Sequence, residues 1–260
     1  MFANEVFLLA VISGLYGLLL GSFANVVIYR VPEGLSVVKP RSACPTCDEP
    51  IGSRDNIPVL SWLILRGRCR HCSTSISSRY PLVELATGAL FVVVALVVGA
   101  DWSLPAHLWF AWSLVSLSMI DIDTHKLPNR LLYPCLAGSL VLLAAAGLIT
   151  SDYRSMMEGA VGGLLSFAVM FVIWFFARGG LGYGDVRLAG LLGLHLGYVS
   201  LPHVPLGLFL GFFAGAAVGI VLLAMGRSRK QKLPFGPFLA VGALATLLWG
   251  QPLIDLYLGR

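Results

Sequence analysis

Charged residues are scarce in this sequence. Only 12% of its 260 residues are Asp, Glu, Lys or Arg, whereas 57% are hydrophobic. This balance excludes an ordinary soluble domain, in which about a quarter of the residues are charged. The 29 glycines and 14 prolines fit a membrane protein, because both residues are more frequent in membrane helices than in soluble ones.

A basic segment is missing from the N-terminus, where Met1–Leu9 carries Glu5 instead. A secretory signal peptide begins with a basic region, so we interpret the first apolar run as a retained helix. The sequence also lacks a surface motif that combines basic and aromatic residues, and we therefore expect no nucleic-acid partner. Internal repeats and low-complexity tracts are not evident either.

Long apolar runs fill most of the chain. Runs of about 18 or more apolar residues predict transmembrane helices. We therefore expect an all-α, polytopic membrane protein with about eight transmembrane helices. The expected segments are residues 6–28, 82–100, 104–121, 131–150, 157–177, 186–200, 204–225 and 234–250. The sixth is short enough to be tilted, partly buried or re-entrant.

Basic residues gather in four connections between these segments, at residues 30–80, 124–130, 177–185 and 226–232. With eight spans, all four connections lie on one side of the membrane. The excess of Lys and Arg predicts that this side is cytoplasmic, with both termini outside. We divide the chain accordingly into a first transmembrane helix, a cytoplasmic loop and a larger transmembrane domain, at residues 1–29, 30–80 and 81–260.

Four cysteines form two Cys-x-x-Cys pairs in the cytoplasmic loop, Cys44 with Cys47 and Cys69 with Cys72. Two such pairs can place four thiolates in a tetrahedron, which structural zinc prefers. Disulfides or unliganded thiols are the alternatives, although a cytoplasmic location argues against stable disulfides. Four protein ligands leave no open position, so we expect a structural zinc that holds the loop together.

Two aspartates are expected at the cytoplasmic ends of helices. Asp121 ends the apolar run 104–121, and Asp185 precedes the run 186–200 within the motif GYGD. Ionisable residues in membrane segments are costly and often functional. Two neighbouring carboxylates can share one proton, so that one activates water while the other polarises a carbonyl. Asp121 and Asp185 are therefore candidates for an aspartic-protease pair.

Structural roles are open for the same carboxylates. Asp121 could reach toward the membrane interface, and Asp185 could cap the helix that follows it. A third carboxylate, Glu84, lies near the start of a helix just after the cysteine loop. It could pair with Arg79 or Arg187, or line a second site.

An ordered set of motifs resembles the bacterial type IV prepilin peptidases, which are also called leader peptidase and N-methyltransferase. The set covers nearly the whole chain and includes the two cysteine pairs. Its other members are GSFANVVIYRVP (21–32), SWLILRGRCRHC (61–72), SSRYPLVELATG (77–88), IDIDTHKLPN (120–129), GLGYGDVRLAG (180–190) and LPFGPFLA (233–240).

The resemblance implies an aspartic endopeptidase of the bacterial cytoplasmic (inner) membrane. Such an enzyme removes the basic leader from prepilins or pseudopilins at the cytoplasmic face and cuts after a glycine. The family's catalytic aspartates map onto Asp121 and Asp185. Members with the cysteine loop usually also methylate the new N-terminus with S-adenosyl-L-methionine. The sequence does not assign residues to that step, for which the loop and Glu84 are the places to search.

Two other classes of function fit parts of the sequence. An ion-coupled transporter could use membrane carboxylates and glycine-broken helices, but it predicts acidic residues near the midplane and paired broken helices. An assembly scaffold for a pilus or secretion system could use the zinc loop to dock a partner. The basic loops should lie near anionic headgroups of membrane lipids.

Overall fold

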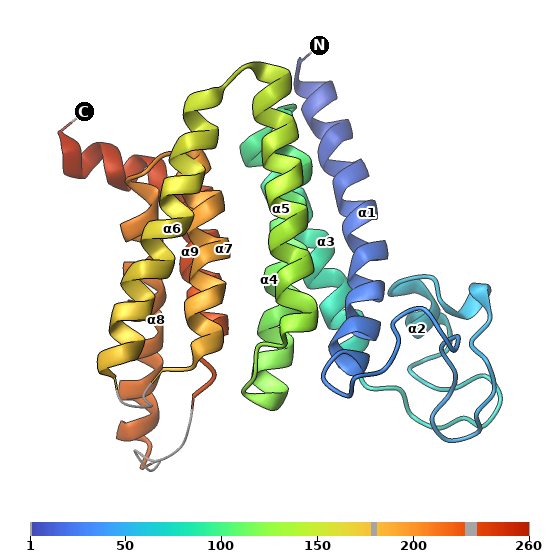
Figure 1. Ribbon diagram of the computed structural model, residues 1–260. Helices are drawn as coiled ribbons and strands as arrows, with labels where there is room; N and C mark the ends of the chain where they lie inside the picture. Colours follow the sequence, from blue (N-terminus) through green and yellow to red (C-terminus); the bar gives the residue numbers. More distant parts are fainter. Residues whose placement is uncertain (1, 178–180, 227–232, 260) are drawn as a thin grey trace. The chain divides into compact units, whose positions relative to one another are not determined.

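The computed structural model describes residues 2–177, 181–226 and 233–259. Within these ranges the regular elements are helices, and no β-strand forms (Figure 1). The basic connection 226–232 lies outside the described residues except for Gly226, as do residues 178–180 of the glycine-rich connection. The chain divides into two compact units, Met1–Ala100 and Asp101–Arg260.

The first unit contains two long helices that pack along each other, a short helix and a single 3-10 turn. These elements are α1 (Phe2–Arg30), η1 (Ser53–Asp55), α2 (Leu60–Ile64) and α3 (Arg79–Val98). A Cβ atom at Gly21 of α1 would lie 2.8 Å from the Cα atom of Glu84 in α3. Glycine therefore lets α1 and α3 meet at backbone distance, as small residues do between membrane helices.

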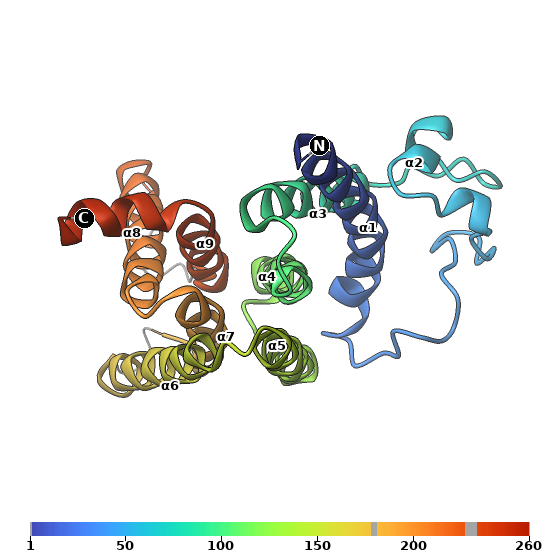
Figure 2. The same ribbon diagram turned by 90° about the horizontal axis from the view of Figure 1, so that it is seen from above.

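The described residues of the second unit contain six helices. They are α4 (Leu104–Thr124), α5 (Asn129–Thr150), α6 (Tyr153–Phe176), α7 (Tyr183–Val199), α8 (His203–Ala224) and α9 (Gly236–Leu258). Helix α7 contacts α5, α6, α8 and α9, and it lies among them in the view from above (Figure 2). Most of its residues are buried, so α7 is the central helix of this unit.

The sixth expected segment is thus a helix of 17 residues. At 1.5 Å per residue it is about 26 Å long, somewhat less than the roughly 30 Å of a bilayer's hydrocarbon core. A helix that is covered by other helices is not in contact with lipid along its length. The unpaired N–H and C=O groups at its two ends can then be covered by protein. Backbone groups at membrane depth that are not paired within a helix need such cover.

Within the part of the chain that the structure describes, six helices are long and apolar enough to cross a membrane, namely α1, α3, α5, α6, α8 and α9. Each of the eight expected segments coincides with a helix, but α4 and α7 are not among these six. Helix α7 is short, and α4 carries buried polar side chains such as His107, Ser113 and Ser116. The chain is therefore an all-helical, multi-pass membrane protein, for which this criterion does not confirm the count of eight spans.

Helix α9 continues eight residues beyond its expected end at residue 250 and bends where it does so. Pro252 lies inside the helix, and the C-terminal part turns away from the rest of α9 (Figure 1). Proline removes a backbone donor and clashes with the preceding turn, which produces such a kink. Near its start, α9 packs closely on α8, because a Cβ atom at Gly242 would lie 2.6 Å from the Cα atom of Gly211.

Candidate active site and candidate metal centre

Asp121 lies in the last turn of α4, and its side chain is buried, with 5% of the residue exposed. Its Oδ2 atom accepts a hydrogen bond of 2.9 Å from the backbone N–H of Gly236, the first residue of α9. The N-terminus of a helix favours a negative charge, because free N–H groups and the helix dipole point toward it. A Cβ atom at Gly236 would lie 2.9 Å from the same oxygen, so only glycine fits there without displacing Asp121.

Asp185 lies in the first turn of α7 and is also buried, with 7% exposed. Its Oδ2 atom accepts a hydrogen bond of 3.1 Å from the N–H of Gly182, the residue before the helix. The N–H of Asp185 in turn donates to the carbonyl of Gly182 at 3.0 Å. The capping role that the sequence left open is therefore present, although Asp185 acts from the third helical residue instead of from the N-cap position.

The two aspartates are close enough for their negative charges to interact. Toward the other ends of the same two helices, the buried imidazoles of His107 and His195 approach to 3.4 Å between their Nδ1 atoms. Because one contact lies at each end, α4 and α7 run in opposite directions. Along α4, His107 and Asp121 are about 21 Å apart, and along α7, Asp185 and His195 are about 15 Å apart, at 1.5 Å per residue. These lengths are similar enough for the two histidines to meet at one end of the helices and the two aspartates at the other.

Two further contacts join the segments that follow Asp121 and surround Asp185. A Cβ atom at Gly184 would lie 3.0 Å from the Cβ atom of Leu127, so the GYGD turn packs directly on the turn after α4. In addition, Nη1 of Arg187 donates a hydrogen bond to Oδ1 of Asn129. The structure thus brings together the two motifs that carry the predicted catalytic residues, although they are distant in the sequence.

This arrangement has the groups that acid–base hydrolysis of a peptide bond requires. Each carboxylate is withdrawn from solvent and is oriented by a backbone N–H group at a helix start. Two such groups can hold one proton between them, which allows one carboxylate to accept a proton from water while the other donates a hydrogen bond. Sequence reasoning missed Gly236, for which the signal was the block LPFGPFLA, and it also missed the histidine pair.

The four loop cysteines converge on one point. Their Sγ atoms all lie within 4.8 Å of one another, and those of Cys44 and Cys72 are 3.7 Å apart. A tetrahedral zinc with Zn–S bonds of 2.3 Å places its sulfur ligands about 3.8 Å apart. The residues present therefore fit a zinc ion of the kind that the paired spacing predicts.

The two cysteine pairs are built as matching turns. The N–H of Cys44 donates to the carbonyl of Glu49, and the N–H of Cys69 donates to that of Thr74. Each turn contains one residue with positive φ directly after its second cysteine, 54° at Asp48 and 58° at Ser73. This conformation folds the chain back, so that both cysteines of a pair face the same side.

Backbone donors in these turns favour the thiolate form that binds metal. Hydrogen bonding from the N–H of Thr46 lowers the pKa of the Cys44 thiol. The N–H of Thr74 lowers the pKa of the Cys72 thiol in the same way. At Cys47 the N–H of Glu49 acts in the same direction, but burial and hydrogen bonds with the neighbouring thiols outweigh it and raise the pKa of this thiol to about 12. The backbone donors thus favour the thiolate form at Cys44 and Cys72.

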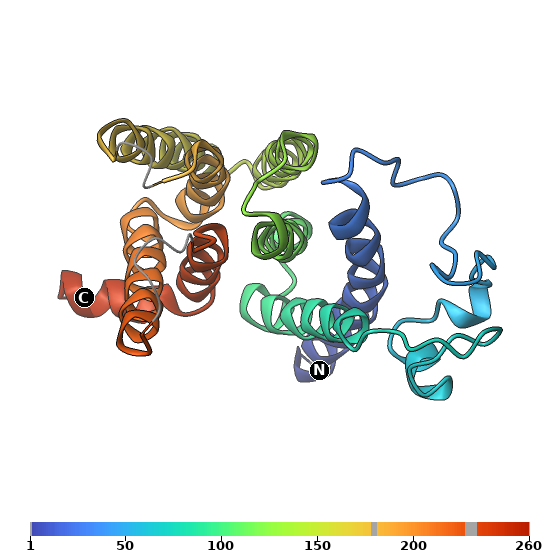
Figure 3. The same cartoon turned by 90° about the horizontal axis from the view of Figure 1, so that it is seen from below.

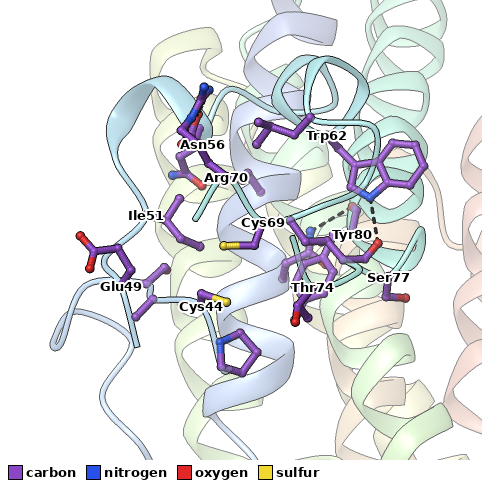
Figure 4. Close-up of a pocket in the computed structure, with 18 of the residues that line it drawn as sticks. Cys44, Glu49, Ile51, Asn56, Trp62, Cys69, Arg70, Thr74, Ser77 and Tyr80 are labelled. Atoms are coloured by element: carbon purple, nitrogen blue, oxygen red, sulfur yellow. Dashed lines mark hydrogen bonds and ion pairs between the residues drawn. The ribbon is translucent and has the colours of Figure 1, made fainter. Parts of the chain in front are cut away.

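A cavity of about 600 Å³ lies beside the cysteine cluster, within the first unit (Figure 4). The end of α1, the loop and the start of α3 all contribute to its walls. Glu84 lines it, and Oε2 of this buried side chain accepts a hydrogen bond of 2.7 Å from the N–H of Val59. Of the roles expected for Glu84, the lining of a second site is the one that this position supports.

Comparisons with known proteins cover both units. Residues 15–98 match the bacterial peptidase A24 N-terminal domain, and residues 108–220 match the type IV leader peptidase family. A prepilin leader peptidase/N-methyltransferase of Aeromonas hydrophila is 38% identical over 94% of this chain and 92% of its own length. A protein with the same description from Stutzerimonas stutzeri is 39% identical, over 93% and 91%. No solved structure matches the chain. With such identity over nearly its whole length, the chain belongs to the type IV leader peptidase family.

Proposed function

We propose that this protein is a membrane aspartic endopeptidase that removes the leader from type IV prepilins or pseudopilins and then methylates the new N-terminus. The observation that carries the proposal is the pair Asp121 and Asp185. Both are buried, each accepts a hydrogen bond from a backbone N–H at a helix start, and their charges interact. The names of the relatives support both activities.

In the proposed mechanism the two carboxylates share one proton. The ionised member takes a proton from a water molecule, which attacks the carbonyl carbon of the scissile bond. The protonated member donates a hydrogen bond to the carbonyl oxygen and stabilises the charge that develops there. The N–H groups of Gly236 and Gly182 hold the carboxylates in position throughout.

The proposed substrate combines a basic leader with an apolar helix. That helix can remain in the membrane and diffuse laterally to a site at the interface, while the leader meets the acidic residues of the enzyme. Of the basic residues that follow Asp121, Lys126 lies in the turn between α4 and α5, and Arg130 lies in the first turn of α5. By the excess of positive charge on cytoplasmic loops, we place the cut at the cytoplasmic face of the inner membrane.

Zinc is the second part of the proposal. Cys44, Cys47, Cys69 and Cys72 would hold one ion, and the match between their sulfur spacing and a zinc tetrahedron supports this. Four protein ligands leave no position for water or substrate, so the ion would stabilise the loop without taking part in hydrolysis. S-adenosyl-L-methionine, when bound, supplies the activated methyl group for N-methylation.

Exchange of either carboxylate for an amide tests the peptidase. Asp121→Asn and Asp185→Asn should each lower the rate of leader removal by at least about a thousandfold, because the amide can neither accept nor donate the shared proton. The control is Asp123→Asn, since Asp123 is an exposed neighbour on the same helix and should retain most activity. Mass analysis of a co-expressed prepilin measures the cut, and size-exclusion chromatography checks the fold. Cleavage at the wild-type rate by either amide variant would show that the pair is wrongly assigned.

A further inference from the structure

Neither Asp121 nor Asp185 lines the cavity of the first unit, so the proposed hydrolysis leaves this cavity without a role. Its volume of about 600 Å³ lies within the 300–1,000 Å³ that is usual for sites of small ligands. The walls combine aromatic, polar, acidic and basic side chains, which include Asn25, Arg30, Trp62, Tyr80 and Glu84. Such a lining suits a ligand that has both a flat apolar ring and charged or polar groups.

We infer that this cavity binds S-adenosyl-L-methionine and that the Glu84 carboxylate faces the positive sulfonium end of this methyl donor. The inference rests on the proposed N-methylation and assigns that step to a site. A cationic ligand with an aromatic base requires a carboxylate, an aromatic surface and hydrogen-bonding groups in one enclosed space.

Glu84 is unusual because only 8% of this carboxylate residue is exposed. Its Oε2 atom accepts the N–H of Val59, but an ionised carboxylate offers about four acceptor positions in total. A buried charge is costly unless it is paired or fully hydrogen-bonded. A cationic ligand in the adjoining cavity would provide the compensating charge.

One residue in contact with Glu84 has an energetically unfavourable backbone conformation. Val59, which donates to Glu84, has φ of 61°, and a β-branched residue rarely adopts a positive φ. Such strain persists where the surrounding structure requires it, and it is most frequent at ligand sites. The contact between Val59 and Glu84 therefore positions a carboxylate oxygen at the cavity wall at the expense of local backbone stability.

The aromatic wall is fixed in advance of any ligand. Nε1 of Trp62 donates to the carbonyl of Ile76 at 3.1 Å, and a Cβ atom at Gly67 would lie 2.9 Å from the Trp62 ring. In Figure 4, Trp62 and Tyr80 lie on one side of the cavity, and Glu49 and Ile51 lie on the other. A preoriented ring can stack on an adenine base or face a cation with little loss of entropy.

The cysteine cluster contributes to the same cavity, because Cys44 and Cys69 are among its lining residues. A side-on pair between Arg70 and Asp55, with Nε to Oδ2 at 2.9 Å, also stands at its wall. The proposed zinc would therefore shape the site for the methyl donor.

During transfer the substrate amine nitrogen forms a bond to the methyl carbon, the sulfur retains the electrons of the broken bond, and the positive charge moves from sulfur to nitrogen.

Direct binding to the purified full-length protein in detergent tests the inference. Isothermal titration uses S-adenosyl-L-methionine and its neutral product, S-adenosylhomocysteine, as two separate probes. Glu84→Gln keeps an acceptor for the Val59 N–H but removes the negative charge. It should weaken binding of the cationic donor about tenfold, as expected for one charged contact, and weaken binding of the neutral product less than threefold.

The control is Glu33→Gln, because Glu33 is exposed and does not line the cavity; both affinities should stay at the wild-type level. Equal affinity of the wild type and Glu84→Gln for the donor, or an equal loss for both probes, overturns the role of Glu84. Photo-crosslinking with radiolabelled donor should label peptides within residues 22–84, and labelling of α4 to α9 instead would overturn the site itself.

Leader removal is measured on the same samples. If the wild type does not cut a prepilin, the proposed function fails, whatever the binding data show. If it cuts but does not bind either probe in the first unit, only the present inference fails.

Discussion

At the scale of single residues, each candidate catalytic carboxylate is matched to one glycine. Asp121 accepts the N–H of Gly236, and Asp185 accepts the N–H of Gly182. A buried carboxylate needs such donors, because an unpaired charge in an apolar environment is strongly unfavourable. Because these N–H groups belong to the backbone at helix starts, the positions of the carboxylates depend on where α7 and α9 begin.

Substitution of the glycine at the start of α9 is predicted to disturb Asp121. In Gly236→Ala the new Cβ atom would lie 2.9 Å from Oδ2, which is too close for an ordinary contact, so the carboxylate must move. A small misplacement of a reacting group can cost about a hundredfold in rate. We expect kcat for leader removal to fall at least about tenfold while KM changes little, as measured by steady-state cleavage of a prepilin in detergent.

Gly52→Ala is the matched control for that experiment. A Cβ atom at Gly52 would meet nothing within 4 Å, and its φ of −68° is open to any residue. This variant should cut at the wild-type rate. A normal kcat for Gly236→Ala would mean that the hydrogen bond to Asp121 has no part in positioning it.

At the scale of helices, the start of α6 depends on one aspartate outside the membrane-spanning segments. Oδ1 of Asp152 accepts the backbone N–H of Ser155 at 3.0 Å. This hydrogen bond lowers the pKa of Asp152 below its usual range. An acid whose pKa is lower in the folded state stabilises the fold at pH values above its unfolded pKa, which is about 3.9 for Asp. This contribution to stability disappears as the pH falls through the pKa of the folded state.

Removal of this cap is therefore predicted to have a pH-dependent cost. Asp152→Ala should lower Tm at pH 7, since loss of an N-cap costs about 1 kcal/mol, and the deficit should shrink when the pH falls below about 3. Asp152→Asn keeps an acceptor without the charge, so its Tm at pH 7 should stay close to that of the wild type. The difference in Tm between Asp152→Asn and Asp152→Ala should not vary with pH. Thermal unfolding in detergent at both pH values measures this. A deficit for Asp152→Ala that is constant with pH would contradict a stabilising role of the ionised form.

At the scale of the whole molecule, the proposed zinc should affect one unit and not the other. The cysteine cluster and the cavity belong to Met1–Ala100, whereas the catalytic pair belongs to Asp101–Arg260. Removal of a structural zinc releases a loop that has little core of its own. We expect about one zinc per chain by elemental analysis, and faster hydrogen exchange in residues 43–77 after treatment with a chelator.

The second unit is the internal control for zinc removal. Exchange rates in α4 to α9 should be unchanged by the chelator, because the structure places no cysteine cluster among the described residues of that unit. Faster exchange throughout both units would show that the metal stabilises the molecule as a whole. Purification of a stable, metal-free loop would contradict the zinc site altogether.

Much of this protein is determined locally and is visible in its sequence. Hydropathy places eight apolar segments because a bilayer-buried backbone must be helical, and each segment coincides with a helix. The convergence of the four cysteines was predictable because two short-spaced pairs can surround a tetrahedral ion by themselves, and the four sulfurs do converge. Asp121 and Asp185 were recognisable because charges are rare in such segments, although their catalytic role stays a prediction until it is tested.

Tertiary structure decides which of these local features meet. Gly236 lies 115 positions from Asp121, and the hydrogen bond between them exists only because α9 packs on α4. The burial of α7, the pairing of His107 with His195 and the cavity beside Glu84 likewise depend on helix–helix contacts. Hydropathy and spacing report what one segment prefers, but such contacts depend on close packing between surfaces that the sequence does not place side by side.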